Sequence, residues 1–365
     1  MQLPPPVHGV SVMSKIIYDS KHINAEFECD YVNLSTSRTV DDLQRGKLYK
    51  LGLALGVFAK AFIKLLFRRY KYVYITIFPY GPSFVKDSLI VLMARILFQR
   101  PILHIHSYGF RKHAEKSKLR RALYQFVFMG TELICLSDLL IEDIETVYEG
   151  PVYILPNGVP QVNLNNTYRV DKAEPTLLYL SNLIRGKGIY LVLQATSILR
   201  NKGYKFKVRV AGTEGDVKYA DLAQEVKRLG IDDTVVLLGP RFGEDKYSEY
   251  RGADIFMLPS DYDTFGLVLL EAMQFGVPCI SSRIGGIPDV LGDGRGVLIS
   301  DVDAATLADG IEELINNPAL RKEMSEKGFG YFTLNFTTDI FEQRLADILS
   351  GKPEKVSRSP LNKAG

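Results

Sequence analysis

The sequence predicts an α/β protein with two halves, each built on a parallel sheet. The chain has 365 residues, 46% of them hydrophobic, which is enough for about two domains with sizeable cores. Short apolar runs alternate with helical patterns along it. These runs are apolar on both faces, as in parallel strands covered by helices. Because ligands bind beyond the carboxyl ends of such strands, we expect two Rossmann-like halves facing a cleft.

The N-terminal half, residues 1–160, carries four strand-like runs and five helical patterns. The expected strands are Tyr72–Phe78, Ile102–Ser107, Leu133–Ser137 and Val152–Leu155. The expected helices are Val12–Ser20, Gln44–Arg69, Phe84–Phe98, Leu119–Phe128 and Asp138–Val147.

The C-terminal half, residues 161–330, follows a polar linker, Asn157–Pro175. Its expected strands are Leu177–Ser181, Val208–Gly212, Val235–Gly239, Asp254–Leu258, Pro278–Ser281 and Gly296–Ile299. Its expected helices are Gly188–Leu199, Val217–Leu229, Asp245–Gly252, Gly266–Phe275 and Ile287–Leu291. Residues 331–350 predict a helix that returns toward the first half, and 351–365 a flexible tail.

The most informative segment is Pro259–Gly276, where a buried strand leads through a loop into an apolar helix. Such a turn directs free N–H groups and a positive helix end at a ligand, which favours a phosphate. Asp263 stands just before these donors, and Glu271 lies one turn inside the helix. Both could be ordinary, as a helix cap and a solvent-facing acid. The apolar neighbours of Glu271 favour a functional role, because an acid in such surroundings needs a partner or a ligand.

This segment resembles the signature of retaining glycosyltransferases of the GT-B fold, family four, whose usual form is P-S-x-x-E-[GTS]-F-G-x4-E-A-M-x-x-G-x-P. The resemblance continues through Val277–Ser281 and Gly285–Asp289. Asp263 replaces the usual Glu, and its spacing to Glu271 is kept. The resemblance implies that Asp263 orients the transferred sugar and that Glu271 binds the ribose. It also implies that the amides of Thr264, Phe265, Gly266 and Leu267 help to hold the diphosphate.

The resemblance assigns further donor contacts to Lys187 and Arg185. Lys187-Gly188 is similar to the family's K-G, whose lysine contacts the pyrophosphate. The family's arginine five residues earlier is Asn182 here, so Arg185 is expected to stand in for it. The alternative for both cations is a solvated loop.

In the first half, His106 and Gly9 are the family-like positions. His106 closes a strand and resembles the histidine that faces the transferred sugar, whereas His104 is expected in the core. Gly9 lies in Pro4–Ser11, which resembles the family's first glycine loop. The family's first strand precedes that loop; only Met1–Leu3 is available here, so this strand is expected to be short or missing. Catalytic roles therefore fall to Asp263, Glu271, His106 and Lys187.

The triplet Asp261-Tyr262-Asp263 matches a D-x-D metal motif of another glycosyltransferase class. Because it lies inside the better-matched pattern, we interpret it as coincidental and expect a metal-independent reaction with no cofactor. The five histidines have no metal-ligand spacing. The donor is expected to be a UDP- or GDP-sugar.

The net charge of +3 hides an asymmetry: residues 1–125 carry 20 Lys/Arg against 8 Asp/Glu, and the remainder carries 25 against 34. Lys60, Lys64 and Arg68 recur along one helical pattern, and a second basic cluster spans Arg111–Arg121. These clusters predict contact with an anionic membrane surface, with a solvated basic edge as the alternative. The sequence lacks the interleaved aromatic and basic residues that stack on and neutralise nucleic acid, so a nucleic-acid partner is not favoured.

Cys29, Cys135 and Cys279 are widely spaced, which predicts thiols in a reducing compartment. No apolar run reaches the ~18 residues of a spanning helix. We therefore expect a cytoplasmic protein, peripheral on the inner face of the membrane.

The sequence thus predicts a glycosyltransferase of the hexosyltransferase type that serves polysaccharide synthesis. It moves sugar from a nucleotide diphosphate to a hydroxyl of a lipid-linked or glycan acceptor. Two alternatives remain: a nucleotide-sugar epimerase-type GT-B enzyme, and a glycosyltransferase-like subunit that binds without turnover. A nicotinamide enzyme is not favoured, because no G-x-G-x-x-G follows a strand.

Overall fold

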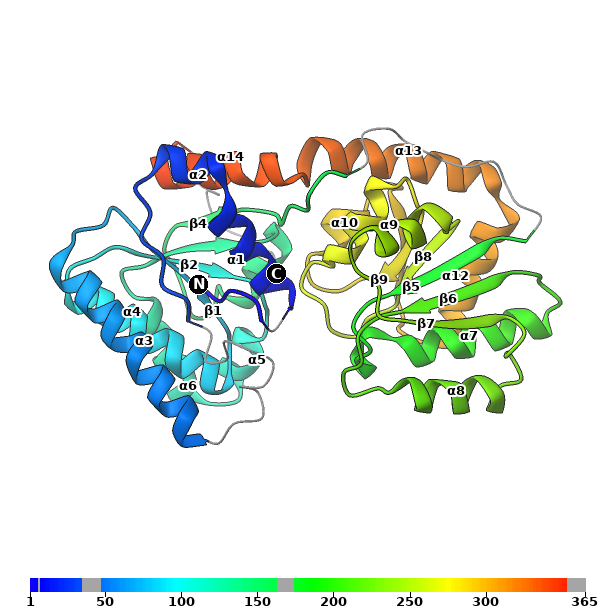
Figure 1. Ribbon diagram of the computed structural model, residues 1–365, viewed down its shortest axis with the longest axis horizontal. Coiled ribbons are helices and arrows are strands. Elements are labelled where there is room, and N and C mark those ends of the chain that lie inside the picture. Colours follow the sequence, from blue (N-terminus) through cyan, green and yellow to red (C-terminus); the bar gives the residue numbers. More distant parts are fainter. Residues whose placement is uncertain (6, 35–46, 163–173, 353–365) are drawn as a thin grey trace, which may run out of the picture. The chain divides into compact units, whose positions relative to one another are not determined.

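The computed structural model describes residues 1–5, 7–34, 47–162 and 174–352, and the chain divides into two compact units. Unit 1 comprises Met1–Asn157 and Thr338–Gly365, and unit 2 comprises Gly158–Thr337. Each unit contains one sheet in which every pairing is parallel, so the predicted fold class is confirmed (Figure 1).

The sheet of unit 1 has the order β1-β2-β3-β4. Its strands are β1 (Val73–Ile77), β2 (Pro101–Ile105), β3 (Glu132–Cys135) and β4 (Val152–Ile154). β1 and β4 lie within their predicted strands, whereas β2 and β3 each begin one residue and end two residues before the predicted ones. Before α1 (Gly9–Asp19) no described residue lies in a strand, so β1 is an edge of this sheet.

Helices lie on both faces of the unit 1 sheet. Figure 1 shows α1, α2 (Lys21–Glu26) and α14 (Thr338–Ser350) together, away from α3 (Lys47–Phe67), α4 (Gly81–Ile96) and α6 (Lys118–Phe128). The second group and α5 (Phe110–Glu115) pack on the sheet through apolar residues that include Ile75, Val91, Leu103, Val127 and Leu133. The predicted helix 138–147 is shorter, a 3-10 helix at Asp138–Asp143.

The six strands of unit 2 have the order β10-β9-β8-β5-β6-β7. They are β5 (Thr176–Leu180), β6 (Lys207–Ala211), β7 (Val235–Gly239), β8 (Ile255–Leu258), β9 (Cys279–Ser282) and β10 (Gly296–Ile299). The chain runs outward from β5 through β6 to β7, then returns to β8 on the other side and continues outward. The strand order therefore reverses between β5 and β8, which is where open α/β sheets bind ligands.

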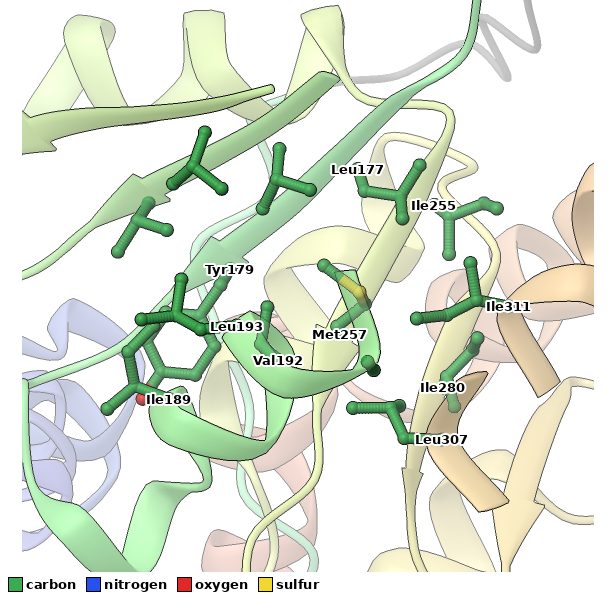
Figure 2. Close-up of a cluster of buried hydrophobic side chains, with 14 of the residues drawn as sticks. Leu177, Tyr179, Ile189, Val192, Leu193, Ile255, Met257, Ile280, Leu307 and Ile311 are labelled. Carbon is green, nitrogen blue, oxygen red and sulfur yellow. The ribbon is translucent and has the colours of Figure 1, made fainter. Parts of the chain in front are cut away.

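Both faces of this sheet are covered. The helices of unit 2 are η3 (Arg185–Lys187), α7 (Ile189–Asn201), α8 (Tyr219–Arg228), α9 (Gly243–Gly252), α10 (Leu267–Gln274), α11 (Ile287–Leu291), α12 (Ala304–Asn316) and α13 (Pro318–Asn335). Figure 2 shows Val192 and Leu193 of α7 and Leu307 and Ile311 of α12 packed against strand residues such as Met257. Alternate β8 residues point the other way, and Phe256 contacts Tyr250 of α9.

The helix predicted over 331–350 is two helices, with a break at Phe336 and Thr337. The amide of Val159 donates to the carbonyl oxygen of Phe336 at 2.9 Å, and Val159 forms a parallel bridge with Thr337. Backbone pairing there competes with helix continuation. The break coincides with the boundary between the units.

The three cysteines are free thiols. Within the described ranges, no helix has the length and hydropathy needed to span a bilayer.

Candidate functional site

The loops that follow β5 and β8 lie against each other at the strand-order reversal of unit 2. The amide of Asp261 donates to the carbonyl oxygen of Gly186 at 3.0 Å. Gly188 has φ +79°, and a Cβ there would lie 2.0 Å from the carbonyl oxygen of Pro259. Only glycine combines this backbone conformation with so close an approach. The contact places Lys187 beside the second loop.

Lys187 and Asp263 form an ion pair across these two loops. The Nζ atom of Lys187 lies 2.6 Å from Oδ2 of Asp263 and 3.4 Å from the carbonyl oxygen of Tyr262. The side chains are 23% and 13% exposed, respectively. Partial burial strengthens the attraction relative to an exposed pair and leaves the ammonium accessible to an anion.

Asp263 also binds the amides that the sequence analysis assigned to phosphate. Its Oδ1 accepts hydrogen bonds from the amide of Phe265 at 3.3 Å and from that of Gly266 at 3.0 Å. Gly266, with φ +75°, then begins α10. Two of the expected phosphate donors are therefore bound to the protein's own carboxylate.

The amide of Leu267 remains at the start of α10. Among the described residues, no acceptor is bonded to it. It lies at the positive end of the helix dipole and within a few residues of the Lys187–Asp263 pair. The site therefore offers an anion one ammonium and one helix-terminal amide.

A third loop supports the one that carries Asp263. The amide of Gly286 donates to the carbonyl oxygen of Thr264 at 2.8 Å, and Thr264 itself is buried. Gly285 has φ +53°, and a Cβ there would lie 2.4 Å from the carbonyl oxygen of Asp263. The Gly285-Gly286 pair thus lets the loop after β9 pack against the backbone of Asp263 and Thr264.

Glu271 has two protein partners from α9. Its Oε1 accepts from Nζ of Lys246 at 2.6 Å, and its Oε2 accepts from the Tyr250 hydroxyl at 2.9 Å. Tyr250 is fully buried, and burial followed by the Glu271 charge raises the pKa of its hydroxyl well above the usual value. Sequence reasoning found the acid but missed both partners, because nothing near Glu271 in the chain indicates α9.

Arg185 and Asn182 lie on the exposed side of the first loop. The guanidinium of Arg185 stacks 4.9 Å above the ring of Tyr190, and its backbone amide donates to Asp216. Arg185 is therefore held at the loop surface within reach of Lys187, two residues later. Asn182 is exposed.

The two carboxylates of the Asp261-Tyr262-Asp263 triplet have different surroundings. Asp261 lies against Gly186, where an added Cβ would meet its Oδ1 at 2.6 Å. Asp263 is turned to Lys187 and to the amides of the α10 start. The two side chains therefore contact different parts of the protein.

In unit 1, His106 and His104 are buried at the end of β2. Their ring centroids are 3.9 Å apart, and Nδ1 of His104 lies 2.5 Å from the hydroxyl of Tyr74. Burial lowers the pKa of His106 to about 3, with a smaller contribution from the charge of His8. Both imidazoles are therefore neutral at physiological pH, and no described residue hydrogen bonds to Nε2 of His106.

His8 caps α1 and fixes the backbone around Gly9. Its Nδ1 accepts the amide of Ser11 at 3.3 Å, and the Ser11 hydroxyl accepts the amide of His8 at 2.9 Å. Gly9 is the first residue of the helix. Since His8 perturbs the pKa of His106, the structure brings this loop close to the strand end that carries His106.

Asp143 fixes the loop after His106, a role that the sequence analysis missed. Its carboxylate accepts three amides, those of Gly109, Phe110 and Arg111, at 2.7, 3.0 and 3.1 Å. Burial raises the pKa of Asp143, and these hydrogen bonds oppose the shift. The amide donors at this strand end are therefore bound internally.

Three cations of the expected membrane-binding edge, Lys64, Arg68 and Arg111, have acidic partners. Lys64 bonds to Asp30, and Arg68 lies 2.9 Å from Asp30 and 3.5 Å from Glu28. Arg111 is paired with Glu115 and Glu142. Lys60 is exposed, and no partner for it is found in the described residues.

Residues 163–330 match the family model described as glycosyl transferases group 1. Unit 2 carries a glycosyl transferases group 1 domain. The family recognised from the Asp263–Glu271 segment is thereby confirmed at the level of group 1.

Curated relatives agree with this assignment. The chain is 34% identical over 192 residues to an N-acetyl-alpha-D-glucosaminyl L-malate synthase of Bacillus anthracis, an alignment that covers 51% of this chain and 48% of the relative. It is 27% identical over 283 residues to the capsular polysaccharide biosynthesis glycosyltransferase CapM of Staphylococcus aureus, covering 71% and 73% of the two chains. The chain thus spans about half the length of the first of these relatives.

Solved structures support the fold of both units. Sucrose-phosphate synthase from Thermosynechococcus elongatus matches with a TM-score of 0.68 at 19% identity, over 87% of this chain and 82% of that one. The Anabaena protein HepE, solved in complex with UDP, matches with a TM-score of 0.66 at 18% identity, over 84% of each chain.

The close approach at Gly188 gives a first prediction for the group 1 domain. Gly188→Ala should destabilise unit 2 by on the order of 3 kcal/mol, because the new methyl group would overlap the Pro259 carbonyl in addition to straining the backbone. Gly203→Ala is the matched control: it also has positive φ, +91°, but nothing lies within 4 Å of its Cβ. It should cost only about 1 kcal/mol. Chemical unfolding of both variants checks this, and equal losses would contradict it.

The buried histidines give a second prediction, on pH. Because the folded pKa of His106 lies below its ordinary value, the unfolded chain takes up the proton first as pH falls. The stability of unit 1 should be fully retained above pH ~6.5 and fall below it by about 1.4 kcal/mol per pH unit for this group.

Urea unfolding between pH 7 and pH 4.5 measures this effect. The His106→Gln variant should show a shallower decline than the wild type. His22→Gln changes an exposed histidine of α2 and serves as the control. A parallel decline in wild type and His106→Gln would show that His106 does not contribute.

Proposed function

We propose that the protein is a retaining glycosyltransferase that moves a sugar from a nucleoside diphosphate donor to a hydroxyl of a lipid-linked or glycan acceptor. The observation that carries the proposal is the Lys187–Asp263 pair at the strand-order reversal of a group 1 domain. A relative named for capsular polysaccharide biosynthesis and a structural neighbour solved with UDP support the acceptor class and the donor class.

In this proposal the ammonium group of Lys187 binds the diphosphate of the donor. Its ammonium has three donors, one of which is directed at Asp263, so it can bind a phosphate oxygen without leaving its partner. The amide of Leu267 and the dipole of α10 add to the positive field. Together they stabilise the negative charge that develops on the leaving diphosphate as the glycosidic bond breaks.

Asp263 is also proposed to act on the transferred sugar. Two amides and one ammonium bind its carboxylate and hold it in place. A fixed negative charge beside the sugar orients its hydroxyls and stabilises the positive charge that develops at the anomeric carbon. No protein nucleophile is invoked, and the acceptor attacks from the side that the diphosphate leaves.

Glu271 is proposed to bind the ribose hydroxyls while bonded to Lys246 and Tyr250. A carboxylate offers about four acceptor positions, and these two partners use two of them. His106, neutral and with Nε2 unpaired, is proposed to hydrogen bond the transferred sugar from unit 1. Gly9 is proposed to allow close approach of the ligand to its loop.

The binding test uses UDP as the probe. Lys187→Ala should weaken UDP binding about 10- to 100-fold, since a hydrogen bond to a charged group contributes about 1.5–3 kcal/mol. Arg185→Ala should weaken it less, because its guanidinium lies over Tyr190 at the loop surface. Lys207→Ala, which removes an exposed lysine bonded to the carbonyl of Asp233, is the matched control. Titration calorimetry measures all four proteins, and unchanged affinity in Lys187→Ala would contradict the assignment.

Turnover separates the proposal from its alternatives. Asp263→Asn should keep UDP affinity within about threefold while lowering transfer strongly, because it removes charge at the sugar and preserves size. Product analysis with UDP- and GDP-sugars distinguishes transfer to an acceptor from release of an epimerised nucleotide sugar. Binding without any product in the wild type would favour a non-catalytic subunit.

The reaction is proposed to be metal-independent, because Lys187 and the α10 start supply the positive charge. Activity should therefore survive EDTA with no more than a small change. Complete loss, restored by Mg²⁺ or Mn²⁺, would instead assign the Asp261-Tyr262-Asp263 triplet to a metal.

We further propose that unit 1 docks on the inner face of the cell membrane, so that a cytoplasmic enzyme meets a lipid-linked acceptor. The support lies in the outward faces of α3, α4 and α6, which are apolar. Exposed aliphatic and aromatic residues on them are Leu55, Phe62, Ile63, Leu66, Phe67, Val85, Leu89, Ile96, Leu119, Leu123 and Phe126. On each helix most of these lie three, four or seven residues apart, which places them along one side of the helix.

The charges on these helices fit an anionic bilayer. The sequences of α3, α4 and α6 contain one acid, Asp87, and it is buried. The basic residues Lys60, Lys118 and Arg120 are exposed beside the stripes. Since Lys64 and Arg68 are paired with Asp30, burial of apolar side chains is proposed to supply most of the binding.

Vesicle co-sedimentation tests this docking. A Phe62→Ser/Phe67→Ser variant should lose most of its binding to vesicles of phosphatidylglycerol and phosphatidylcholine, whereas Lys60→Glu/Lys118→Glu should weaken it only at low salt. The control Phe242→Ser/Leu334→Ser removes two exposed apolar side chains from unit 2. If all variants pellet like the wild type, these helix faces do not bind lipid.

A further inference from the structure

The helix that carries Glu271, α10, lies beside α9 in unit 2 (Figure 1). The Glu271 side chain is 16% exposed, so the protein shelters its carboxylate and still leaves it accessible to a ligand. Its neighbours along α10 are apolar, among them Val268, Leu270 and Ala272. Within the described residues, α9 supplies every hydrogen bond to this carboxylate.

Each carboxylate oxygen of Glu271 has one partner on α9. Lys246 donates to Oε1 at 2.6 Å, and the Tyr250 hydroxyl donates to Oε2 at 2.9 Å. These two donors are four residues apart in the sequence, so they lie one turn apart on the same face of the helix. The last side-chain torsion of a glutamate is broadly distributed when nothing holds it. With a separate donor on each oxygen, the plane of this carboxylate is fixed.

The position of α9 is itself fixed by two further contacts. The Tyr250 ring is fully buried and stacks on Phe275 with 5.8 Å between the ring centroids. The preceding residue, Glu249, is bound by two nitrogens of the Arg209 guanidinium from β6, at 2.6 and 2.9 Å. Such a bidentate ion pair fixes orientation as well as position. The donors to Glu271 therefore cannot move along the helix axis without breaking these contacts.

Neither donor needs Glu271 for the stability of the fold. Lys246 is 21% exposed, and a partly exposed ion pair of this kind contributes little to stability. The buried Tyr250 hydroxyl has a second acceptor within reach, the carbonyl oxygen of Val268 at 3.3 Å. The arrangement is better explained by what it does to the carboxylate.

The bonded carboxylate has about two acceptor positions left, one on each oxygen, because each oxygen accepts about two hydrogen bonds. Two neighbouring hydroxyls of one ligand fill both. Glu271 lies one turn, about 5.4 Å, beyond Leu267, whose amide belongs to the proposed diphosphate site, and side chains on a helix lean toward its N-terminus. In a nucleoside diphosphate the ribose directly follows the first phosphate. The two hydroxyls are therefore those of the ribose.

We propose that Lys246 and Tyr250 are positioning residues: they orient Glu271 so that each of its oxygens accepts one ribose hydroxyl, which makes the site selective for ribonucleotides over 2′-deoxyribonucleotides. A 2′-deoxy ligand leaves one of these acceptors unpaired in a partly buried site and binds less tightly. The inference rests on the proposed ribose-binding role of Glu271. It adds two residues of α9 that act through this acid.

The experiment compares the Kd of UDP with that of 2′-deoxy-UDP by titration calorimetry, with GDP and 2′-deoxy-GDP in their place if GDP binds more tightly. The wild type should prefer the ribonucleotide about tenfold or more, the effect of one hydrogen bond to a charged group. Tyr250→Phe and Lys246→Met should each reduce this preference to about threefold or less. Lys246→Arg, which keeps a cationic donor, should restore most of it.

Two matched controls separate orientation of the carboxylate from general damage. Tyr247→Phe removes a hydroxyl from the same helix, and Lys227→Met removes an exposed lysine from α8; both should keep the wild-type preference. If Lys246 and Tyr250 served only the fold, their variants would unfold at a lower temperature and bind both nucleotides equally less tightly. An unchanged preference of that kind would overturn the inference.

Glu271→Gln tests the assignment on which the inference rests. A wild type without a preference, or a preference that survives in Glu271→Gln, would overturn the ribose role and the inference together. A preference that is lost in Glu271→Gln but kept in Tyr250→Phe and Lys246→Met would overturn only the inference and leave the ribose role in place. A preference kept in one of these two variants would overturn the role of that residue.

Discussion

The Asp263 carboxylate organises the candidate donor site, since three of its closest partners come from two different loops. Its Oδ1 binds the amides of Phe265 and Gly266, and its Oδ2 binds Lys187 from the loop after β5. Because both oxygens are used, the carboxylate cannot turn without losing a hydrogen bond. The positions of Lys187 and of the α10 start are therefore linked through one side chain.

This link depends on glycines that allow backbones to touch. Gly188 lets the first loop approach Pro259, and Gly285 lets the loop after β9 approach Asp263. Both have positive φ and would place a Cβ within 2.4 Å of a carbonyl oxygen. The sequence shows a Gly at each position but not this contact, since the second partner lies some 70 residues away for Gly188 and on another strand connection for Gly285. A larger residue at either position would push these loops apart.

Local patterns in the sequence predicted the strands, the start of α10 and the acid at Asp263, because each depends on residues within one or two turns. Contacts between elements were not predictable in the same way. The sequence indicated that Glu271 needs a partner or a ligand, and only the fold shows that Lys246 and Tyr250 of α9 bind it. Lys64 and Arg68 were expected to form a free basic edge, but Asp30 lies across from them after the chain has folded. Charge pattern along a helix gives the number of cations, and only the fold gives their partners.

In both units, a carboxylate binds backbone amides of the loop that follows a central strand. In unit 1, Asp143 binds the amides of Gly109, Phe110 and Arg111; in unit 2, Asp263 binds those of Phe265 and Gly266. In each case a carboxylate binds amides that would otherwise attract an anion at a helix start. The consequence differs, because only Asp263 is also paired with a partly exposed lysine. In the proposed reaction, attraction for a diphosphate is therefore concentrated on Lys187 and the Leu267 amide of unit 2, whereas burial keeps His106 of unit 1 neutral. The same local motif is thus combined with a cation in one unit and with neutral imidazoles in the other.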